Sequence, residues 1–387
     1  MIGDIVCIIV IIVIAIDILP IFYKWLSRIH IGRYSDKKEW EKSLINISEK
    51  WINKTPKIKV TDNTRLVIID MLRKNYTKSA IQHWQEAALL LGLAECNQND
   101  TRKKIEKFID NKINNKGMWI KEPQNVDGAI LAYALMNLDK NTIKKCKPAL
   151  DSTWNMIKDH IGEDGTVKYR KNMANYRYVD TIGFICPFLI KYGVEFNNEE
   201  AVELAVKQIK EYRTNGMLIG SDLPYHAYDI KTKVPLGLCG WGRGLGWYAI
   251  GLIDAWHELP DSNKYKSELK MYVKNFTKEI IKVQNGNGGW NWTVTRKESR
   301  TDSSATATLA WFLVNAYEID EISEECKKSL DKAISYLMTV TKRSGAIDFS
   351  QGDTKDIGAY SILFDILPFT QGFALRTICK YSRVGVK

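Results

Sequence analysis

The sequence predicts an all-α fold, a closed ring of helical hairpins preceded by one apolar N-terminal helix. Apolar residues recur at i, i+3 and i+4 through long stretches that begin near Lys37, the spacing of helices with one buried face. Runs that alternate apolar and polar residues, as half-buried strands do, are nearly absent. The loops between the helical stretches also repeat at roughly fifty to seventy residues, one helix pair plus a loop, which indicates stacked or closed helical hairpins.

The first element is an apolar segment that we predict to be a transmembrane anchor over residues 1–23. Residues 5–16 are uninterrupted apolar sequence, Asp17 breaks the run, and residues 18–23 continue it. The stretch of about 18–19 residues is just long enough to cross a bilayer. No basic residues precede it and no small-residue cleavage site follows, so a secretory signal peptide is disfavoured. A buried core helix is the alternative.

Residues 24–36 form a basic juxtamembrane linker in this interpretation. By the positive-inside rule, basic residues that follow a span place the rest of the chain in the cytoplasm. The cysteines, seven in number and without paired spacing, favour a reducing compartment and indicate neither a disulfide framework nor a metal site. The basic residues that follow the span are Lys24, Arg28, Arg33, Lys37 and Lys38.

Residues 37–387 are predicted to be a single domain, because no linker or change of composition divides them. The periodicity predicts helices over residues 36–52, 78–96, 101–112, 126–138, 142–159, 179–192, 198–212, 247–259, 264–284, 303–319, 324–339 and 360–381. The repeated loops begin with Gly117, Gly165, Gly216, Gly289 and Gly345. If the long loops share one side of a double ring, the starts of the inner helices meet at one cleft.

Polar residues at those helix starts are therefore the candidate site. Asp127 opens one helix, Asp180 the next and Asp302 a later one. A lone Asp at a helix start is usually an N-cap, whose carboxylate accepts hydrogen bonds from first-turn amides. Repetition in register favours function here, because two carboxyl groups in one cleft are what acid–base chemistry on a glycoside requires.

A second group of candidates surrounds a glycine-rich block, residues 240–247. It places Arg243 among glycines and between Trp241 and Trp247, with His226 shortly before and Tyr178 beside Asp180 in sequence. Glycines let the backbone approach a ligand, and an arginine beside an indole suits a sugar ring that carries a carboxylate. The alternative is a glycine-rich loop with two buried indoles and no ligand.

The charge and composition exclude several classes of function. The formal net charge is +11, but the lysines are spread along the chain, so a nucleic-acid partner is disfavoured. An acidic polysaccharide or an anionic membrane surface fits the charge equally well. With five His and no HExxH or CxxC motif, we expect neither a metal nor another cofactor.

Five motifs together resemble a known family. They are NVDG at 125–128, YVDTIGFICPFL at 178–189, YHAYD at 225–229, WGRGLGW at 241–247 and DSSATA at 302–307. Their order and spacing resemble those of the unsaturated glucuronyl and rhamnogalacturonyl hydrolases, glycoside hydrolase families 88 and 105, over about residues 37–385. The resemblance implies an (α/α)6 barrel and hydration of the C4=C5 double bond that a polysaccharide lyase leaves on a uronic acid.

The resemblance also implies a role for each candidate residue. Asp180 would be the acid that protonates C4 and the base that activates water, and Asp127 would position that water and the ring. The uronate would be held by His226, Trp241, Arg243 and Trp247, with Tyr178 in the aromatic wall. Family members often carry a His about eleven residues before the catalytic Asp, where this chain has Tyr169 followed by Arg170 and Lys171. Asp302 stands where a Glu is common, and the N-terminal anchor is atypical.

Two alternatives remain at this point. One is a toroid that binds acidic polysaccharide without cleaving it, in exopolysaccharide assembly, which would need Arg243 and the aromatic cleft but not Asp180. The other is a lyase or epimerase on the same scaffold, which would need a Tyr/His or His/His proton pair, and His226 is the only well-placed His.

Overall fold

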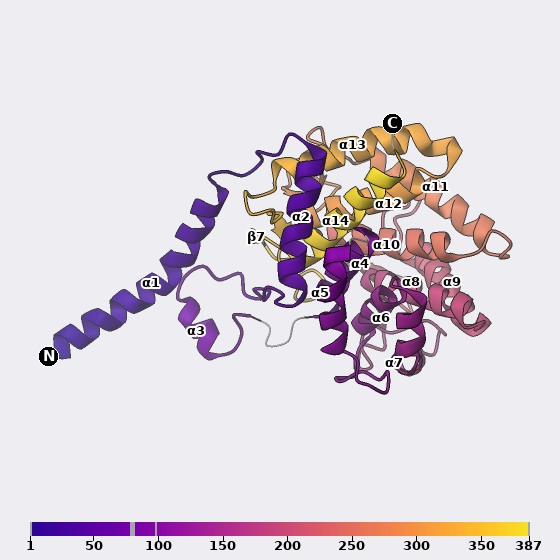
Figure 1. Cartoon of the computed structure of the whole chain (residues 1–387), viewed down its shortest axis with the longest axis horizontal. Coiled ribbons are helices and arrows are strands. Elements are labelled where there is room, and N and C mark those ends of the chain that lie inside the picture. Colours follow the sequence, from indigo (N-terminus) through magenta and orange to yellow (C-terminus); the bar gives the residue numbers. More distant parts are fainter. Residues whose placement is uncertain (1, 78–81, 97–98, 386–387) are drawn as a thin grey trace.

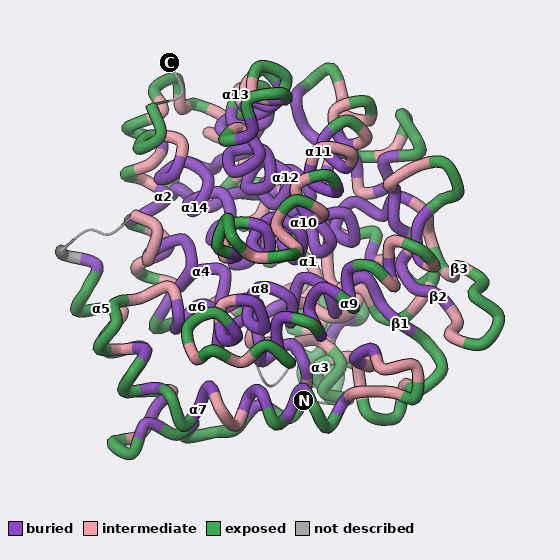
Figure 2. Tube along the Cα trace, turned by 90° about the vertical axis from the view of Figure 1, so that its right-hand side faces the viewer, coloured by how far each residue is buried: buried purple, intermediate pink, exposed green. Residues whose placement is uncertain are grey.

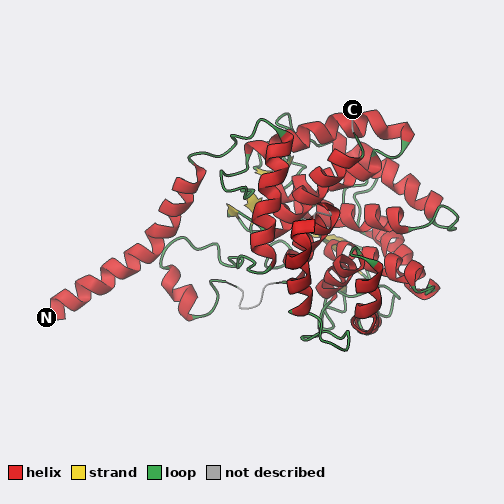
Figure 3. Ribbon diagram, in the orientation of Figure 1, coloured by secondary structure: helices red, strands yellow, loops and turns green. Residues whose placement is uncertain are grey.

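The computed structural model describes residues 2–77, 82–96 and 99–385. In this part of the chain, six helical hairpins form a closed double ring (Figures 1 and 3), and the prediction of an all-α (α/α)6 barrel is confirmed. Each inner helix packs against its two neighbours, and the last, α14, packs against the first, α4, to close the ring. The inner helices are α4 (His83–Cys96), α6 (Ala129–Met136), α8 (Val179–Glu195), α10 (Gly242–Glu258), α12 (Ser303–Ala316) and α14 (Pro368–Arg383).

The outer helices cover the inner ring and carry the amphipathic pattern. Figure 2 shows the inner helices buried along most of their length and the outer ones exposed on one side. Because an inner helix is covered by neighbours on every side, a polar face on it would be buried away from water. An outer helix has one side in contact with solvent, and polar residues occupy that side. The outer helices are α2 (Lys37–Ile52), α5 (Asn99–Asp110), α7 (Lys140–Lys158), α9 (Glu199–Asn215), α11 (Lys266–Lys282) and α13 (Ser323–Thr339), and two short 3₁₀ helices are η1 (Val126–Gly128) and η2 (Asp320–Ile322).

The repeated glycine loops share a structure. Short antiparallel bridges close four of them: Ile113 with Trp119, Ile161 with Val167, Met217 with Pro224, and Thr341 with Ile347. In three of these loops the glycine has a positive φ, 76° at Gly117, 71° at Gly165 and 88° at Gly345. A residue with a Cβ is strained in this conformation, which explains the recurrence of glycine.

Short strands lie in the same connections, between the repeated glycine loops and the starts of the inner helices. They form three small antiparallel sheets, and β1 and β5 lead directly into α8 and α12. The strands are β1 (Tyr176–Tyr178), β2 (Ala227–Asp229) and β3 (Pro235–Leu236), then β4 (Trp290–Asn291) with β5 (Thr301–Asp302), and β6 (Ser350–Gln351) with β7 (Phe364–Asp365).

The predicted helix boundaries hold within a few residues for most elements, with three differences. The helix expected at 360–381 begins at Pro368, because residues 364–365 pair with β6 as β7 and a proline is favoured at the first position of a helix. The helix expected at 78–96 begins at His83, and residues 78–81 lie outside the described part of the chain. The glycine-rich block is not a loop, because α10 begins at Gly242 and not at Trp247. A Cβ at Gly242 would meet the carbonyl oxygen of Asn291, and one at Gly246 would meet Thr308. The glycines therefore allow close helix packing, which outweighs their poor helix propensity.

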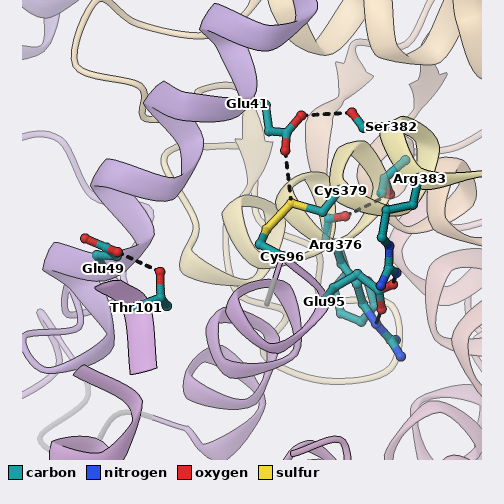
Figure 4. The surroundings of a disulfide bond; sticks show 11 residues. Glu41, Glu49, Glu95, Cys96, Thr101, Arg376, Cys379, Ser382 and Arg383 are labelled. Carbon is teal, nitrogen blue, oxygen red and sulfur yellow. Dashed lines mark hydrogen bonds and ion pairs between the residues drawn. A yellow bond between two sulfur atoms is a disulfide. The ribbon is translucent and has the colours of Figure 1, made fainter. Parts of the chain in front are cut away.

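The expectation that the cysteines form no disulfide is wrong. Cys96 at the end of α4 is bonded to Cys379 in α14 (Figure 4), although 283 residues separate them. The closing contact of the ring brings the two together, and sequence spacing cannot reveal such a pair. Around the bond, Glu41 accepts a hydrogen bond from Ser382 at 2.8 Å and Glu95 forms an ion pair with Arg383.

Two further helices lie outside the double ring. The long helix α1 (Ile2–Arg28) projects from it (Figure 1), and none of its residues is buried, so the buried-core alternative is excluded. It continues past Tyr23, the predicted end of the apolar segment. Among the described residues it is the one helix long and apolar enough to cross a membrane, a test that signal sequences also pass. The short helix α3 (Val67–Leu72) packs beside it.

Candidate active site

A cavity of about 80 Å³ lies where the inner helices begin. Six of the seven predicted site residues line it, from β1, α8, the segment before β2, and the start of α10: Tyr178, Asp180, His226, Trp241, Arg243 and Trp247. Residues from 178 to 247 thus converge although they come from two different connections between an outer and an inner helix. The arrangement follows from the ring itself, because every inner helix presents its N-terminus to the same end.

Asp180 is the carboxyl group at the bottom of this cavity. Its side chain is only 13% exposed, and its Oδ2 atom is buried without a hydrogen-bond partner. Burial raises its pKa to about 7, although the charge of Arg243 acts in the opposite direction. A carboxyl with this pKa holds a proton near neutral pH, as a general acid must.

His226 faces Asp180 as a neutral imidazole. Its Nε2 atom is 3.6 Å from Asp180 Oδ2, and its Nδ1 atom is 3.0 Å from the Tyr360 hydroxyl oxygen. Burial, with the charge of Arg243, lowers the pKa of His226 to about 4. The Tyr360 oxygen already accepts the Leu238 N–H at 2.9 Å, so its own proton is free to go to Nδ1. This arrangement favours the tautomer that directs an Nε2–H toward Asp180.

Arg243 and Trp241 both hold the segment that follows β6. Arg243 donates to the carbonyl oxygens of Gln351 and Gly352, each at 2.6 Å, and to the Thr354 hydroxyl at 3.3 Å. Trp241 Nε1 donates to the Gln351 side chain at 2.9 Å. The guanidinium is therefore fixed by backbone oxygens, and this buried group contributes positive charge beside Asp180.

Aromatic rings form the remaining walls. The ring of Trp247 lies 4.5 Å from that of Phe184 and 5.6 Å from that of Trp84. Tyr178 packs at 4.9 Å against Tyr169, whose ring in turn lies 6.2 Å from that of Phe184. Such flat apolar surfaces suit the faces of a sugar ring, and they exclude the water that would otherwise stabilise the charged form of Asp180.

Asp127 lies apart from the other candidates. It is buried in η1, is not among the described residues that line the cavity, and forms an ion pair with Arg170 at 3.4 Å. The Arg170 guanidinium in turn covers the ring of Tyr169 at 4.1 Å, and Tyr169 lines the cavity. The residues at 169–170 that depart from the family pattern thus stand between Asp127 and the cavity, while Lys171 is exposed.

The three helix-start aspartates differ in what they do. Asp302 is an N-cap, because its carboxylate accepts the amides of Ser304 at 2.9 Å and Ala305 at 3.4 Å, and also that of Gln351 at 2.9 Å. The helix starts at Asp127 and Asp180 have no side-chain cap hydrogen bond. The capping interpretation therefore describes Asp302 alone of the three.

Of the rest of the lining, the sequence had drawn attention only to Tyr169 and, within the motif at 178–189, to Phe184. Trp84 lies in an apolar helix and carried no distinguishing signal, and Met173 lies in an irregular loop. The segment 353–356 after β6, Asp-Thr-Lys-Asp, also lines the cavity. Its polar composition resembles that of any surface loop, so only the tertiary structure reveals it. Among the described residues, no three His, Cys, Asp or Glu side chains are grouped to hold a metal ion.

Comparison with known proteins agrees with this architecture. The family model of Glycosyl Hydrolase Family 88 matches residues 51–373. The chain is 19% identical over 296 residues to the unsaturated rhamnogalacturonyl hydrolase YesR of Bacillus subtilis, covering 73% of this chain and 82% of YesR.

Two solved structures share the fold. A possible member of the GH105 family from Klebsiella pneumoniae has a TM-score of 0.75 and 18% identity, covering 91% of this chain and 95% of that one. The unsaturated glucuronyl hydrolase of Bacillus sp. GL1 has a TM-score of 0.63 and 13% identity, covering 88% and 95%. The family match spans most of the ring and includes the whole cavity, and the chain therefore belongs to Glycosyl Hydrolase Family 88 and is a glycoside hydrolase.

Proposed function

We propose that this protein hydrolyses oligosaccharides that end in an unsaturated uronic acid, by hydrating the C4=C5 enol ether. The observation that carries the proposal is Asp180, a carboxyl group with a raised pKa and a buried, unpartnered oxygen in an aromatic cavity. An enol ether needs one proton donor and one oriented water, and a carboxyl in this state can supply the first and activate the second. The activities of YesR, an unsaturated rhamnogalacturonyl hydrolase, and of the Bacillus sp. GL1 unsaturated glucuronyl hydrolase support the same substrate class.

In this proposal the Asp180 O–H donates its proton to C4 and leaves positive charge shared between C5 and the ring oxygen. Water adds to C5 while the Asp180 carboxylate takes one of its protons, which restores the acid. The product is a hemiketal at C5. Its ring opens to a C5 ketone, and the hemiacetal left at C1 breaks down to release the remaining saccharide with a free hydroxyl group.

The neighbouring residues support these steps by position and charge. The Nε2–H of His226 points at Asp180 Oδ2 and can orient the acid or the sugar carboxylate. The charge of Arg243 favours an anionic substrate, and Trp247 offers a flat wall for the ring. Asp127 is proposed to assist through the Arg170–Tyr169 contact, because it does not itself line the cavity.

We further propose that α1 anchors the protein as a single span, with the domain on the cytoplasmic side. The basic residues after the apolar segment support this orientation. The Cys96–Cys379 disulfide is the observation against it, since such bonds persist in oxidising compartments. The flanking charges set the proposed orientation, because they act during insertion, before the ring that brings the two cysteines together has closed.

The test is turnover of unsaturated disaccharides made by a polysaccharide lyase, followed by loss of ultraviolet absorbance from the C4=C5 bond. We expect the wild type to be active, Asp180→Asn to lose activity by orders of magnitude, and Asp127→Asn to lose less. The matched control is Asp164→Asn, a half-buried aspartate paired with the buried Arg177 outside the cavity. A wild type that binds acidic oligosaccharide but turns over no unsaturated uronide would instead be a binding toroid.

A further inference from the structure

The short helix α3 exposes an unusual amount of apolar surface. Its residues Ile69, Met71 and Leu72 are 42%, 39% and 79% exposed, and Leu66 just before it is 56% exposed. Exposed apolar side chains gathered on one short helix are typical of a surface that contacts a partner, and not of a surface that faces water. The exposed basic residues Arg65, Arg73 and Lys74 flank the helix at both ends.

A second observation ties α3 to the apolar helix α1. The carboxylate of Asp17, the one charge inside the apolar run, accepts hydrogen bonds from the backbone amides of Leu66 at 2.6 Å and Val67 at 3.0 Å. These amides are the first of α3, which have no partner within the helix. Leu66 adopts φ 51°, a left-handed conformation that is uncommon for a residue with a side chain. This pairing is stabilising inside a bilayer, because an unpaired carboxylate and unpaired backbone amides each carry a high free-energy cost there.

The level of this contact follows from α1 itself. Phe22, Tyr23 and Trp25 are exposed near the end of α1, where aromatic side chains typically mark the membrane interface. Asp17 precedes Tyr23 by six residues, which corresponds to about 9 Å along a helix. If α1 spans the bilayer, α3 begins below the level of the aromatic residues, among lipid headgroups or the upper acyl chains.

We propose that α3 is an in-plane membrane helix that lies in the same bilayer as α1 and docks the active-site end of the protein on the lipid surface. This proposal rests on the proposed α1 anchor, and the partner that α3 contacts is a lipid bilayer. The exposed apolar surface of α3 continues that of α1, and its basic flanks suit anionic headgroups.

The connection to the active site runs through the residues that precede α3. The Asp62 carboxylate accepts a hydrogen bond from Ser361 at 2.6 Å and pairs with Lys355 at 3.2 Å. Lys355 lines the cavity. From the other side, Lys24 at the end of α1 pairs with Asp365 in β7 at 2.9 Å. The end of α1 and the residues just before α3 therefore both hold the connection from β6 to β7, of which residues 353–356 line the cavity, so we expect that side of the cavity to face the bilayer.

The test places an environment-sensitive fluorophore at Leu72→Cys in the full-length protein, reconstituted in vesicles of phosphatidylethanolamine and phosphatidylglycerol. Native Cys7 and Cys239 are changed to serine in this background, because they are the described free cysteines that are not buried. Ile219→Cys, 99% exposed in the loop between α9 and β2, is the matched control. Quenching is measured with nitroxide-labelled acyl chains and with aqueous iodide.

We expect the label at position 72 to be quenched by the lipid nitroxide and to be several-fold less sensitive to iodide than the label at position 219. Asp17→Ala should release α3 and make the label at position 72 as sensitive to iodide as the control. Equal iodide sensitivity at positions 72 and 219 in the protein that retains Asp17 would overturn the proposal. A second protein that keeps Cys7 and Leu72, with only Cys239 changed to serine, distinguishes the two failures: if lipid nitroxide does not quench a label on Cys7 either, the α1 anchor is wrong as well.

Discussion

The Nε2 atom of His226 lies 3.6 Å from Oδ2 of Asp180, an oxygen that is buried and has no hydrogen-bond partner. A buried carboxylate without partners is costly, so this oxygen is best accommodated when the carboxyl is protonated or when a ligand enters. The imidazole is held in place from its other side by Tyr360, at 3.0 Å. The pair therefore resembles an acid and its orienting neighbour, in a cavity that keeps water away from both.

The first prediction concerns stability. Because the folded pKa of Asp180, about 7, exceeds the ordinary value of 3.8, the native state holds the proton more tightly than the unfolded chain. Below pH 4 both states are protonated and Asp180 imposes no penalty. Between pH 4 and 7 the penalty grows, to about 4 kcal/mol at most. Asp180→Asn should therefore match the wild type near pH 4 and be more stable at pH 8, as measured by denaturant unfolding in one detergent. An equal difference at both pH values would contradict the raised pKa.

The second prediction concerns the pH dependence of turnover. Activity on an unsaturated disaccharide should decline as pH rises through about 7, because the acid loses its proton there. A limb on the acid side is expected near pH 4, where His226 becomes charged. The measurement is kcat/KM against pH, which reports groups of the free enzyme. A rate that rises from pH 6 to pH 9 would show that Asp180 acts only as a base.

Tyr360 gives a third prediction, as a positioning residue. Tyr360→Phe removes the hydrogen bonds to His226 Nδ1 and from the Leu238 amide, and keeps the ring that packs on Trp241 at 5.4 Å. The proton of His226 is then free to move to Nδ1, which turns a lone pair toward Asp180. We expect kcat to fall roughly tenfold to a hundredfold, as for other groups that act through a catalytic neighbour, and the acid limb of the pH profile to shift. Tyr317→Phe, a partly buried tyrosine outside the cavity, is the control, and loss of activity in both variants would indicate a structural effect.

Much of this architecture follows from local sequence patterns. The helices could be predicted because each outer helix must carry an apolar face toward the ring. Six of the seven candidate residues line one cavity because the starts of the inner helices and the segments before them converge, and the roles of these residues stay predictions. The sequence did not predict Tyr360, which meets His226 across 134 residues, or the disulfide across 283. It also mistook the start of α10, where tertiary packing favours glycine. Contacts between distant segments produce no periodic pattern in the sequence. The helix α3, with 6 residues, is too short to show the spacing of apolar residues that identifies a helix.

Arg243 gives a fourth prediction. The sequence predicted that the Arg243 guanidinium is free to bind a carboxylate of the substrate. In the structure, its two terminal nitrogens donate hydrogen bonds to the carbonyl oxygens of Gln351 and Gly352. Arg243→Lys replaces the guanidinium with one ammonium group, which cannot bind both carbonyl oxygens in the same geometry. We expect KM for the unsaturated substrate to rise and the 352–356 segment to exchange its amide hydrogens faster. Arg102→Lys, on the exposed face of α5, is the control. An unchanged KM would remove Arg243 from substrate binding.

The last prediction concerns the N-terminal segment. Deleting residues 1–23 removes the apolar span but keeps Lys24 and Arg28, whose ion pairs with Asp365 and Asp348 secure the end of α1 to the domain. The ring makes its own closing contact between α4 and α14, so the truncated chain should fold, remain soluble and keep the helical circular dichroism of the domain. Arg28→Gln in the same truncated chain should cost about 3 kcal/mol, because it leaves Asp348, which is fully buried, with Lys342 as its remaining cation. An exposed arginine, Arg102→Gln, should change stability far less. A truncated chain without helical structure would show that α1 is part of the folding unit, and the proposal that it serves as an anchor would then fail.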